Sequence, residues 1–469
     1  MNITFDSAQI EKAPKGFVRI RLTEEAKSTS RFVREGEITW IELGAGKRAE
    51  MTRRKFMLLV RQIILCAKSE KVKKIAIQFD KTPFPALKSL QPQKVASLVA
   101  ENLEMANFEF NTFKTKPKEG FAEVEEVLVM GPVTLAMKKG FERGQIIGQE
   151  VNECRALANM PGGDMTPTLL AKAAIAATGG TKAKVAVLGR LDMERLSMGA
   201  ILGVAKGSTE EPKFIVMEYW GAGKGAKKKP LVLVGKGVTF DSGGLNIKTG
   251  DHMYEMHLDM SGGAAVIHAV ALAAKLNVKR NIIGLIPAVE NMPGNEAYRP
   301  GDILRSMSGK TIEVLNTDAE GRVILADALT YAKKYDPSLV VEASTLTGAS
   351  LIALGQHASA VLSKDEKLMN KIKDLGEMSG DLVWPMPLWD EYDHMVEGVF
   401  GDIPNIPAVG NSRYAGVIGG GKFLEKFADS YPFAHLDIAP RMTAAPGDHL
   451  AKGAAGAPVR LFLAIAENL

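Results

Sequence analysis

The sequence predicts an α/β protein of two domains: a smaller N-terminal α/β domain (residues 1–150) and a larger C-terminal domain (residues 151–469) whose mixed sheet is sandwiched by helices. Three observations predict this arrangement. The chain has 469 residues, which is more than one ordinary hydrophobic core accommodates. Strand and helix patterns alternate along the second part of the chain, as expected when helices cover a largely parallel or mixed sheet. A long helical pattern from Leu135 to Asn159, ended by the breaker "MPGG", marks the boundary between the domains.

The first domain mixes strands and helices and contains no cluster of candidate catalytic residues. Apolar runs predict strands at "FVRIRL", "EITWIEL", "KKIAIQF" and "EVEEVLVM". Helical periodicity predicts helices at "TRRKFMLLVRQIILCAKS" and "QKVASLVAENLEMANF". We therefore expect this domain to serve as a scaffold or in assembly.

The second domain is predicted to carry the functional site. Its expected strands are "AKVAVLG", "PKFIVMEYW", "PLVLVGKGVTF", "NIIGLIPAV", "KTIEVL" and "LVVEAST". Helices are expected at residues 262–276 and 319–334, each between two of these strands. This order predicts a sheet that is covered by helices on both faces.

Composition and charge exclude several classes of protein. Hydrophobic content is 46% and charged content 24%, which is typical of a globular protein. The 59 basic and 54 acidic residues give a net charge of only +5, so charge favours neither a nucleic acid nor a membrane as partner. Cys66 and Cys154 form no disulfide framework, which fits a reducing compartment. The N-terminus has no signal-peptide pattern, and the apolar run "GGAAVIHAVALAAKLN" is too short for a membrane span, so a cytoplasmic protein is expected.

Charged residues gather in three segments where a strand pattern passes into a helix pattern. The segments are "GKGVTFDSGGLNIK", "HLDMSGGAAV" and "NTDAEGR", with Lys236, Asp241, Lys248, Asp259, Asp318, Glu320 and Arg322. Each residue alone is more often a helix cap or a surface ion pair. Because such transitions lie along one edge of a wound sheet, we expect the seven side chains to converge.

A converged site of this kind favours divalent metals. Four carboxylates in one site raise each other's pKa, and two lysines and an arginine compensate for their charge only in part. Paired divalent cations would compensate more fully, and such pairs are a common device for hydrolysis. The seven histidines are scattered without an HExxH pattern, so the ligands would be oxygens with at most one lysine nitrogen. A lysine ligand would be the neutral amine, whereas a second, charged lysine could polarise a substrate oxygen.

The same segments resemble the signatures of the leucyl (cytosol) aminopeptidases, the M17 metallopeptidases. The resemblance rests on "VGKGVTFDSGGLNIK", "MHLDMSGGAA" and "NTDAEGR", and it continues in "ASTLTGA", "PLWDEY", "RYAGVI" and "AHLDIA". It covers essentially all of the chain after residue 150, whereas the first domain shows only the general plan of the family's smaller domain. The resemblance implies an aminopeptidase that hydrolyses N-terminal residues from peptides at a two-metal centre.

Carried over to this sequence, the resemblance implies a role for each charged residue. Lys236, Asp241, Asp259 and Glu320 would bind the tighter metal ion. Asp241, Asp318 and Glu320 would bind a second, exchangeable ion, the two metals being zinc and/or manganese with a bridging hydroxide. Lys248 would act as the electrophile on the scissile carbonyl. Arg322 would hold a bicarbonate ion that serves as proton shuttle.

The resemblance also implies a pocket for the side chain of the N-terminal substrate residue. Its apolar walls would be Met256, Thr345, Ala439 and Met442, and the backbone carbonyls of Leu346 and Gly348 would contact the substrate. Taken singly, the two methionines are more often core residues. A methionine lining adapts to different shapes, so a preference for Leu- or Met-like residues with broad tolerance is expected.

Two other classes of function remain as alternatives. Some members of the family double as DNA-binding proteins, but the sequence has no basic stripe with interleaved aromatic residues. Another two-metal hydrolase, such as a phosphoesterase, conflicts with the uncharged character of the expected pocket. The resemblance further implies a homohexamer that acts on peptides.

Overall fold

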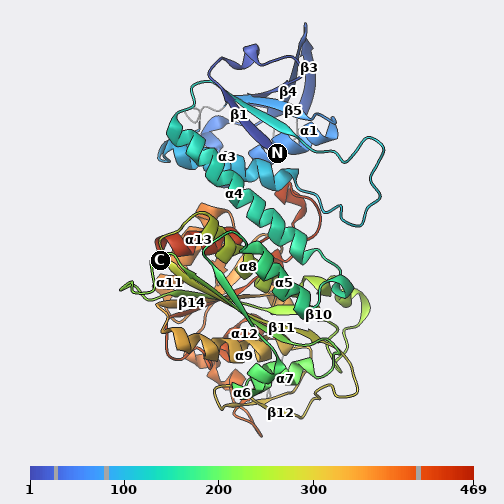
Figure 1. Cartoon of the computed structure of the whole chain (residues 1–469), viewed down its shortest axis with the longest axis vertical. Helices are drawn as coiled ribbons and strands as arrows, with labels where there is room; N and C mark the ends of the chain where they lie inside the picture. The colour runs from blue at the N-terminus through green and yellow to red at the C-terminus, as the bar shows by residue number, and fades with distance from the viewer. Residues whose placement is uncertain (26–29, 79–83, 408–413) are drawn as a thin grey trace. The chain divides into compact units, whose positions relative to one another are not determined.

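A computed structural model of the chain describes residues 1–25, 30–78, 84–407 and 414–469 (Figure 1). The chain forms two compact units: Met1–Asn152 with Ala445–Lys452, here called the N-terminal unit, and Glu153–Ala444 with Gly453–Leu469, the C-terminal unit. The functional division at residue 150 stays a prediction. Phe79 of the expected strand "KKIAIQF" and Arg413 of "RYAGVI" lie outside the described residues.

The N-terminal unit contains a six-stranded sheet in the order β1-β6-β5-β2-β4-β3, parallel except for the β3–β4 pair. Its elements are β1 (Asn2–Asp6), β2 (Val18–Thr23), β3 (Ser30–Glu35), β4 (Ile38–Gly44), α1 (Arg53–Ser69), β5 (Lys74–Gln78), α2 (Pro85–Lys88), α3 (Pro92–Asn107), β6 (Glu126–Met130) and the larger part of α4 (Leu135–Ala158), whose last residues belong to the C-terminal unit. The edge strands β1 and β3 are additional to the expected elements. An edge strand needs few buried apolar residues and so leaves a weak pattern, as the largely exposed β3 illustrates.

Helix α1 shows why these residues form a packed layer. Phe56, Leu59, Val60, Ile63 and Ile64 follow helical spacing and are buried in the core of this unit. The helix begins after Thr52, whose hydroxyl accepts a hydrogen bond from the Lys55 amide at 3.2 Å. Apolar spacing, capping and burial therefore favour the same helix.

The C-terminal unit is built on a nine-stranded mixed sheet, which confirms the predicted fold class. The strand order is β16-β15-β18-β14-β9-β11-β8-β7, and β10 pairs with β11. The strands are β7 (Lys184–Leu188), β8 (Lys213–Trp220), β9 (Leu231–Gly235), β10 (Gly237–Asp241), β11 (Asn281–Asn291), β14 (Leu339–Ser344), β15 (Ser359–Leu362), β16 (Val383–Pro385) and β18 (Phe433–Asp437). The four central strands β18, β14, β9 and β11 are parallel.

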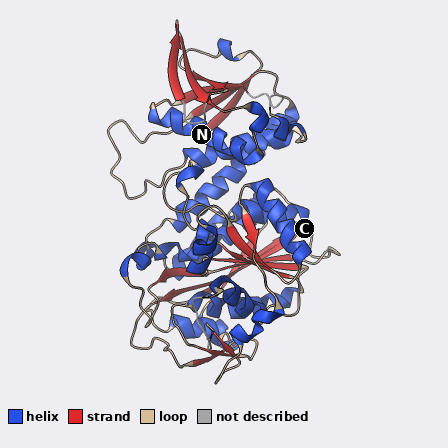
Figure 2. Ribbon diagram, turned by 180° about the vertical axis from the view of Figure 1, so that it is seen from behind, coloured by secondary structure: helices blue, strands red, loops and turns tan. Residues whose placement is uncertain are grey.

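Helices cover both faces of this sheet (Figures 1 and 2). One face carries α5 (Pro167–Ala177), α8 (Ser261–Lys275), α11 (Glu366–Ser379) and α13 (Val459–Asn468). The other carries α6 (Arg190–Arg195), α7 (Gly199–Ala205), α9 (Glu320–Ala332) and α12 (Gly416–Glu425), and α10 (Gly348–Leu354) follows β14. Residues 250–275 are long and apolar enough to cross a membrane by length and composition, but 89% of their most apolar window is buried within the protein. Since α8 packs on β9, β11 and β14, this segment is a core helix.

Two expected strands differ from the structure. "PLVLVGKGVTF" is not one strand: the ladder is interrupted at Lys236, so that β9 and β10 are separate. "KTIEVL" contributes β13 (Thr311–Glu313) to a separate three-stranded sheet with β12 (Ile303–Arg305) and β17 (Ile403–Pro404). An apolar alternation predicts a strand but not the sheet that the strand joins.

Asp327 anchors the start of α7 through a fully buried carboxylate. It accepts hydrogen bonds from the amides of Ala200 and Ile201 at 3.0 Å and from the amide of Met307 at 2.7 Å. Asp327→Asn would turn one acceptor oxygen into a donor that faces a backbone N–H. We expect the free energy of unfolding to fall by about 2 kcal/mol, measured by urea denaturation. The exposed Asp336→Asn is the control, with an expected change below about 0.5 kcal/mol.

Candidate metal centre

The break between β9 and β10 places Lys236 in the interior. Its backbone N–H donates to Ala343 O at 3.2 Å, and its carbonyl accepts from the Gly263 amide at 2.7 Å. Glycines make these close approaches possible: a Cβ on Gly235 would lie 2.3 Å from Gly262 O, and a Cβ on Gly321 would lie 2.6 Å from Cε of Lys236. The glycines of "GKG" and "AEGR" therefore allow the lysine side chain to pass over the start of α9.

Lys236 forms the centre of one half of a buried cluster. Its Nζ lies 2.7 Å from Asp259 Oδ2 and 2.7 Å from Glu320 Oε1, and it donates to Thr345 O at 3.2 Å. Asp259 lies in the 3₁₀ helix Met256–Met260, and Glu320 is the first residue of α9. Burial opposes the charge on Lys236, but the surrounding carboxylates raise its pKa, so without a metal this lysine is an ammonium ion.

Lys248 forms the centre of the other half. Its Nζ lies 2.8 Å from Asp241 Oδ2 and 2.5 Å from Asp318 Oδ1. Asp241 ends β10, and its second oxygen accepts from the Gly243 amide at 2.9 Å and from Asn291 Nδ2 at 2.8 Å. The loop after β10 can turn back toward Asp318 because Gly243 and Gly244 have positive φ.

Thr317 and Asn246 join the loop that carries Asp241 and Lys248 to the loop that carries Asp318. The Asn246 amide donates to Thr317 Oγ1 at 2.8 Å, and the Thr317 amide donates to Asn246 Oδ1 at 2.8 Å. Asn291 donates both to Asp241 and, at 2.9 Å, to Thr317 O. Asp241 and Asp318 are therefore held by the same polar network.

The cluster has the donor set of a cation site. Oxygen atoms of Asp241, Asp259 and Glu320 all lie within 4.8 Å of one another, and the three side chains are buried. Asp259 Oδ2, Asp318 Oδ1 and Glu320 Oε1 are buried oxygens, and each forms an ion pair with a lysine ammonium. Four carboxylates outnumber the two lysines, so the residues present fit divalent cations.

The pKa shifts of the carboxylates point in the same direction. Burial and the charge of Asp241 raise the pKa of Glu320 to about 8. Burial raises the pKa of Asp259 to about 6, although the charge of Lys236 opposes this shift. Carboxylates that resist ionisation in this way are stabilised in the charged form by a nearby cation.

Arg322 lies in the first turn of α9 and is 7% exposed. Its Nε has no hydrogen-bond partner, and within the described ranges no carboxylate approaches its guanidinium to within 4.0 Å. Burial lowers its pKa to about 10, while the charges of Glu320 and Asp437 oppose the shift. A buried guanidinium in this state is suited to binding a small anion.

The structure brings together some of the residues predicted to form the pocket for the substrate side chain. Thr345 Oγ1 donates to Asp259 Oδ1 at 2.7 Å, which places it against the metal centre. The amides of Leu346 and Ala439 donate to one oxygen of Asp437, so these two positions lie close together. Gly348 begins α10 and is exposed. Met256, on the same 3₁₀ turn as Asp259, and Met442, directly after the 3₁₀ helix Ala439–Arg441, are both half-buried.

Sequence reasoning missed three residues of the site: Asn291, Thr317 and Asp437. Asn291 ends the buried strand β11 and Asp437 ends β18, and both side chains are fully buried. A polar residue at the end of an apolar strand could have indicated both positions in the sequence, because buried polar groups require hydrogen-bond partners.

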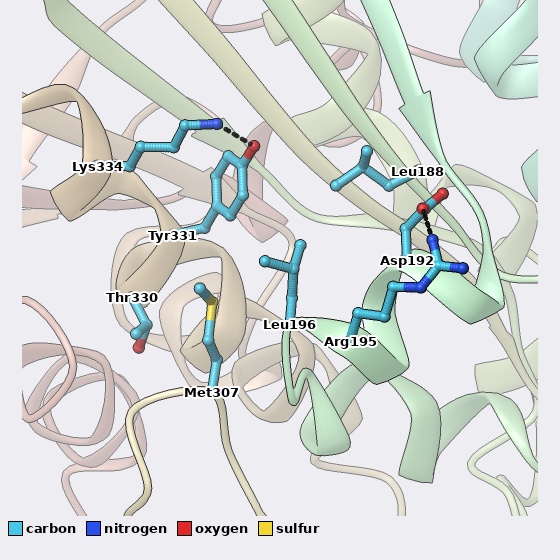
Figure 3. A pocket seen from close by; sticks show the side chains of 8 residues that line it. All are labelled: Leu188, Asp192, Arg195, Leu196, Met307, Thr330, Tyr331 and Lys334. Atoms are coloured by element: carbon cyan, nitrogen blue, oxygen red, sulfur yellow. Dashed lines mark hydrogen bonds and ion pairs between the residues drawn. The ribbon is translucent and has the colours of Figure 1, made fainter.

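A separate hollow of about 510 Å³ in the C-terminal unit contains none of the predicted site residues (Figure 3). Its lining is Leu188, Asp192, Arg195, Leu196, Met307, Thr330, Tyr331 and Lys334. Thr330 lies ten residues beyond Glu320, which is about 15 Å along α9. The charged cluster, rather than this apolar hollow, is the candidate active site.

Comparisons with known proteins identify the family of the chain. Residues 152–463 match the cytosol aminopeptidase family, catalytic domain, and residues 34–117 match the N-terminal domain of the same family. A "Probable cytosol aminopeptidase" of Aromatoleum aromaticum is 46% identical over 361 residues, which cover 76% of this chain and 70% of that protein. Its counterpart in Saccharophagus degradans is 40% identical over 429 residues, covering 90% and 84%.

The solved structure of the "Bottromycin maturation enzyme BotP in complex with Mn" has the same fold, with a TM-score of 0.85 at 26% identity. The match covers 97% of this chain and 99% of that one. Sequence and structure thus agree over both units, and the chain belongs to the cytosol aminopeptidase family, peptidase family M17, as a metal-dependent aminopeptidase and hydrolase.

Proposed function

We propose that this protein removes N-terminal residues, preferentially Leu- or Met-like ones, from peptides by means of two divalent metal ions. The observation that carries the proposal is the cluster of four carboxylates and two lysines, in which Asp241, Asp259 and Glu320 are buried and their oxygens lie within 4.8 Å of one another. Lys236, Asp241, Asp259 and Glu320 would hold one ion. Asp241, Asp318 and Glu320 would hold the other. When bound, zinc and/or manganese would activate a water molecule and polarise the scissile carbonyl.

The protein's own residues then have distinct tasks. Lys236 must lose a proton to become a ligand, because in the structure it is the counter-ion of Asp259 and Glu320. Asn291 and the Gly243 amide hold Asp241 in position. Lys248, the more exposed lysine of the two, would donate to the carbonyl oxygen as negative charge develops there.

Arg322 is proposed to hold a bicarbonate ion. Its buried guanidinium, without a described carboxylate within 4.0 Å, supports an anion at this place. Bicarbonate there would carry a proton between water and the leaving amine. A carboxylate paired directly with Arg322 would occupy the place of the bicarbonate ion. Among the described residues, Glu320 and Asp437 act on the Arg322 charge only from a longer distance.

The pocket, the assembly and the cellular location complete the proposal. Met256, Thr345, Ala439 and Met442 would line the pocket, and the carbonyls of Leu346 and Gly348 would bind the peptide backbone. We propose a cytoplasmic homohexamer in which the N-terminal unit contributes to assembly. The names of the cytosolic relatives support the location.

Removal of the metal is expected to abolish activity reversibly. Hydrolysis of leucyl-p-nitroanilide should fall to background after chelator treatment, because no side chain of the cluster alone can activate water to the same degree. Zinc, manganese, cobalt or magnesium would be restored singly, and recovery would rank the ions. A well-folded protein, judged by circular dichroism, that hydrolyses nothing with any ion would refute the proposed function.

A further inference from the structure

Two parallel neighbouring strands lead into the proposed substrate pocket. Strands β14 and β18 pair in register, so that Ser344 and Asp437 lie side by side at their carboxyl ends. The loop after β14 carries Thr345, Leu346 and Gly348. The loop after β18 carries Ala439 and Met442. The two walls of the pocket thus come from loops that are separate in sequence and must be held in register.

Asp437 connects these two loops directly. Its Oδ1 accepts from the Leu346 amide at 3.3 Å and from the Ala439 amide at 3.2 Å, and its Oδ2 accepts from Thr347 Oγ1 at 2.6 Å. The side chain is fully buried. One carboxylate therefore receives three donors from both walls of the pocket.

The loop after β14 is fixed at its other end by the metal centre. Thr345 donates to Asp259 Oδ1, so the segment from Thr345 to Thr347 is held between Asp259 and Asp437. Hydrogen bonds to a charged acceptor are shorter and stronger than neutral ones, and a buried acceptor without donors is costly. The spacing between Leu346 and Ala439 thus depends on the charge at position 437.

We propose that Asp437 is a positioning residue that sets the separation of the two walls of the substrate side-chain pocket and thereby determines which N-terminal residues the enzyme accepts. The proposal rests on the proposed aminopeptidase function. Asp437 itself touches neither substrate nor metal in this scheme. It acts through Leu346, Thr347 and Ala439.

The protein offers a matched control for a general loss of stability. Asp327 is equally buried and also accepts three hydrogen bonds, but its donors belong to the start of α7 and to Met307. Asp437→Asn and Asp327→Asn both replace a buried carboxylate by an amide of the same shape. An effect on selectivity that only Asp437→Asn shows cannot come from reduced stability alone.

The test compares kcat and KM for leucyl- and alanyl-p-nitroanilide in the two variants with metal restored. We expect Asp437→Asn to lower the ratio of kcat/KM for leucyl over alanyl substrate by about tenfold, since a looser pocket loses more contact with the larger side chain. Asp327→Asn should leave this ratio within about twofold. Equal ratios in both variants and the wild type would overturn the proposal.

Thr347 allows a milder version of the same test. Thr347→Val removes one of the three donors, together with the hydroxyl that accepts from the Ser350 amide at the start of α10, whereas Thr347→Ser keeps both hydrogen bonds and should retain the wild-type ratio. These variants decide the matter if Asp437→Asn does not fold. A ratio that is unchanged in Thr347→Val, or equally changed in Thr347→Ser, would speak against positioning by Asp437.

Hydrogen exchange separates this proposal from the proposed function. In Asp437→Asn, and not in Asp327→Asn, amides of residues 345–348 and 438–442 should exchange about tenfold faster, measured by mass spectrometry. A wild-type protein inactive on all substrates would refute the aminopeptidase proposal, while the exchange data would still decide whether Asp437 holds the loops. Unchanged exchange in both loops would overturn the positioning role.

Discussion

Glu320→Gln is expected to lower kcat/KM for leucyl-p-nitroanilide by about a thousandfold or more. Glu320 is 1% exposed, opens α9, and belongs to both proposed ligand sets. The amide keeps the shape of the side chain but removes a negative charge from a site where cations must be bound. Because Lys236 Nζ lies 2.7 Å from Glu320 Oε1, the substitution also leaves this ammonium with one fewer counter-ion.

Metal content distinguishes a ligand from a structural residue. Purified Glu320→Gln should contain less than the full complement of metal per chain by elemental analysis, and kcat should remain low at saturating substrate. Glu218→Gln is the matched control, because Glu218 lies on β8 of the same sheet and hydrogen-bonds Tyr335 and Trp220 instead. Wild-type metal content and kcat in Glu320→Gln would contradict the assignment.

The sequence predicted most elements of the fold because their patterns are local. The helix expected from Leu135 to Asn159 is observed at Leu135–Ala158, and the expected helix at 262–276 is observed at Ser261–Lys275. The features that the sequence did not predict, such as the break between β9 and β10, depend on tertiary contacts. The apolar run around Lys236 predicts one strand, but the ladder is interrupted at Lys236, whose carbonyl accepts from the Gly263 amide of α8 and whose side chain reaches Asp259 and Glu320.

The candidate site was likewise predictable from local sequence only in part. Charged residues between strands and helices indicated which groups could converge, and the structure places Asp241, Asp259 and Glu320 within reach of one ion. Asn291 and Asp437 were not predicted as site residues, because a single polar residue at the end of an apolar strand does not indicate its hydrogen-bond partners. The pairings themselves, such as Asn291 with Asp241 across 50 residues, arise only when the loops are packed together.

The protonation state of Lys236 differs between the role predicted from the sequence and the contacts in the structure. As a metal ligand this residue must be a neutral amine. In the structure it is instead paired with two carboxylates, which raise its pKa. Both statements hold if binding of a cation replaces a proton, so metal affinity should increase with pH.

Lys248→Met is expected to reduce kcat by about a hundredfold to a thousandfold with little change in KM. Lys248 is the more exposed of the two lysines: 13% of its side chain is accessible to solvent, compared with 4% for Lys236. Its contacts, Asp241 and Asp318, are proposed metal ligands, so in the loaded enzyme its charge becomes available to the substrate. Methionine keeps the length of the side chain and removes the charge that would stabilise the developing oxyanion.

Three comparisons test whether this lysine acts on the substrate or only holds its two carboxylates apart. Lys248→Arg keeps a positive charge and should recover part of kcat, although the guanidinium is larger and differently shaped. Lys334→Met should behave as wild type, because Lys334 lies at the separate hollow and donates to Tyr331 Oη at 3.1 Å (Figure 3). Metal content should stay at the wild-type level in Lys248→Met. Loss of metal in parallel with activity would mean that Lys248 organises the ligands, because an electrophile that acts on the substrate alone leaves metal binding intact.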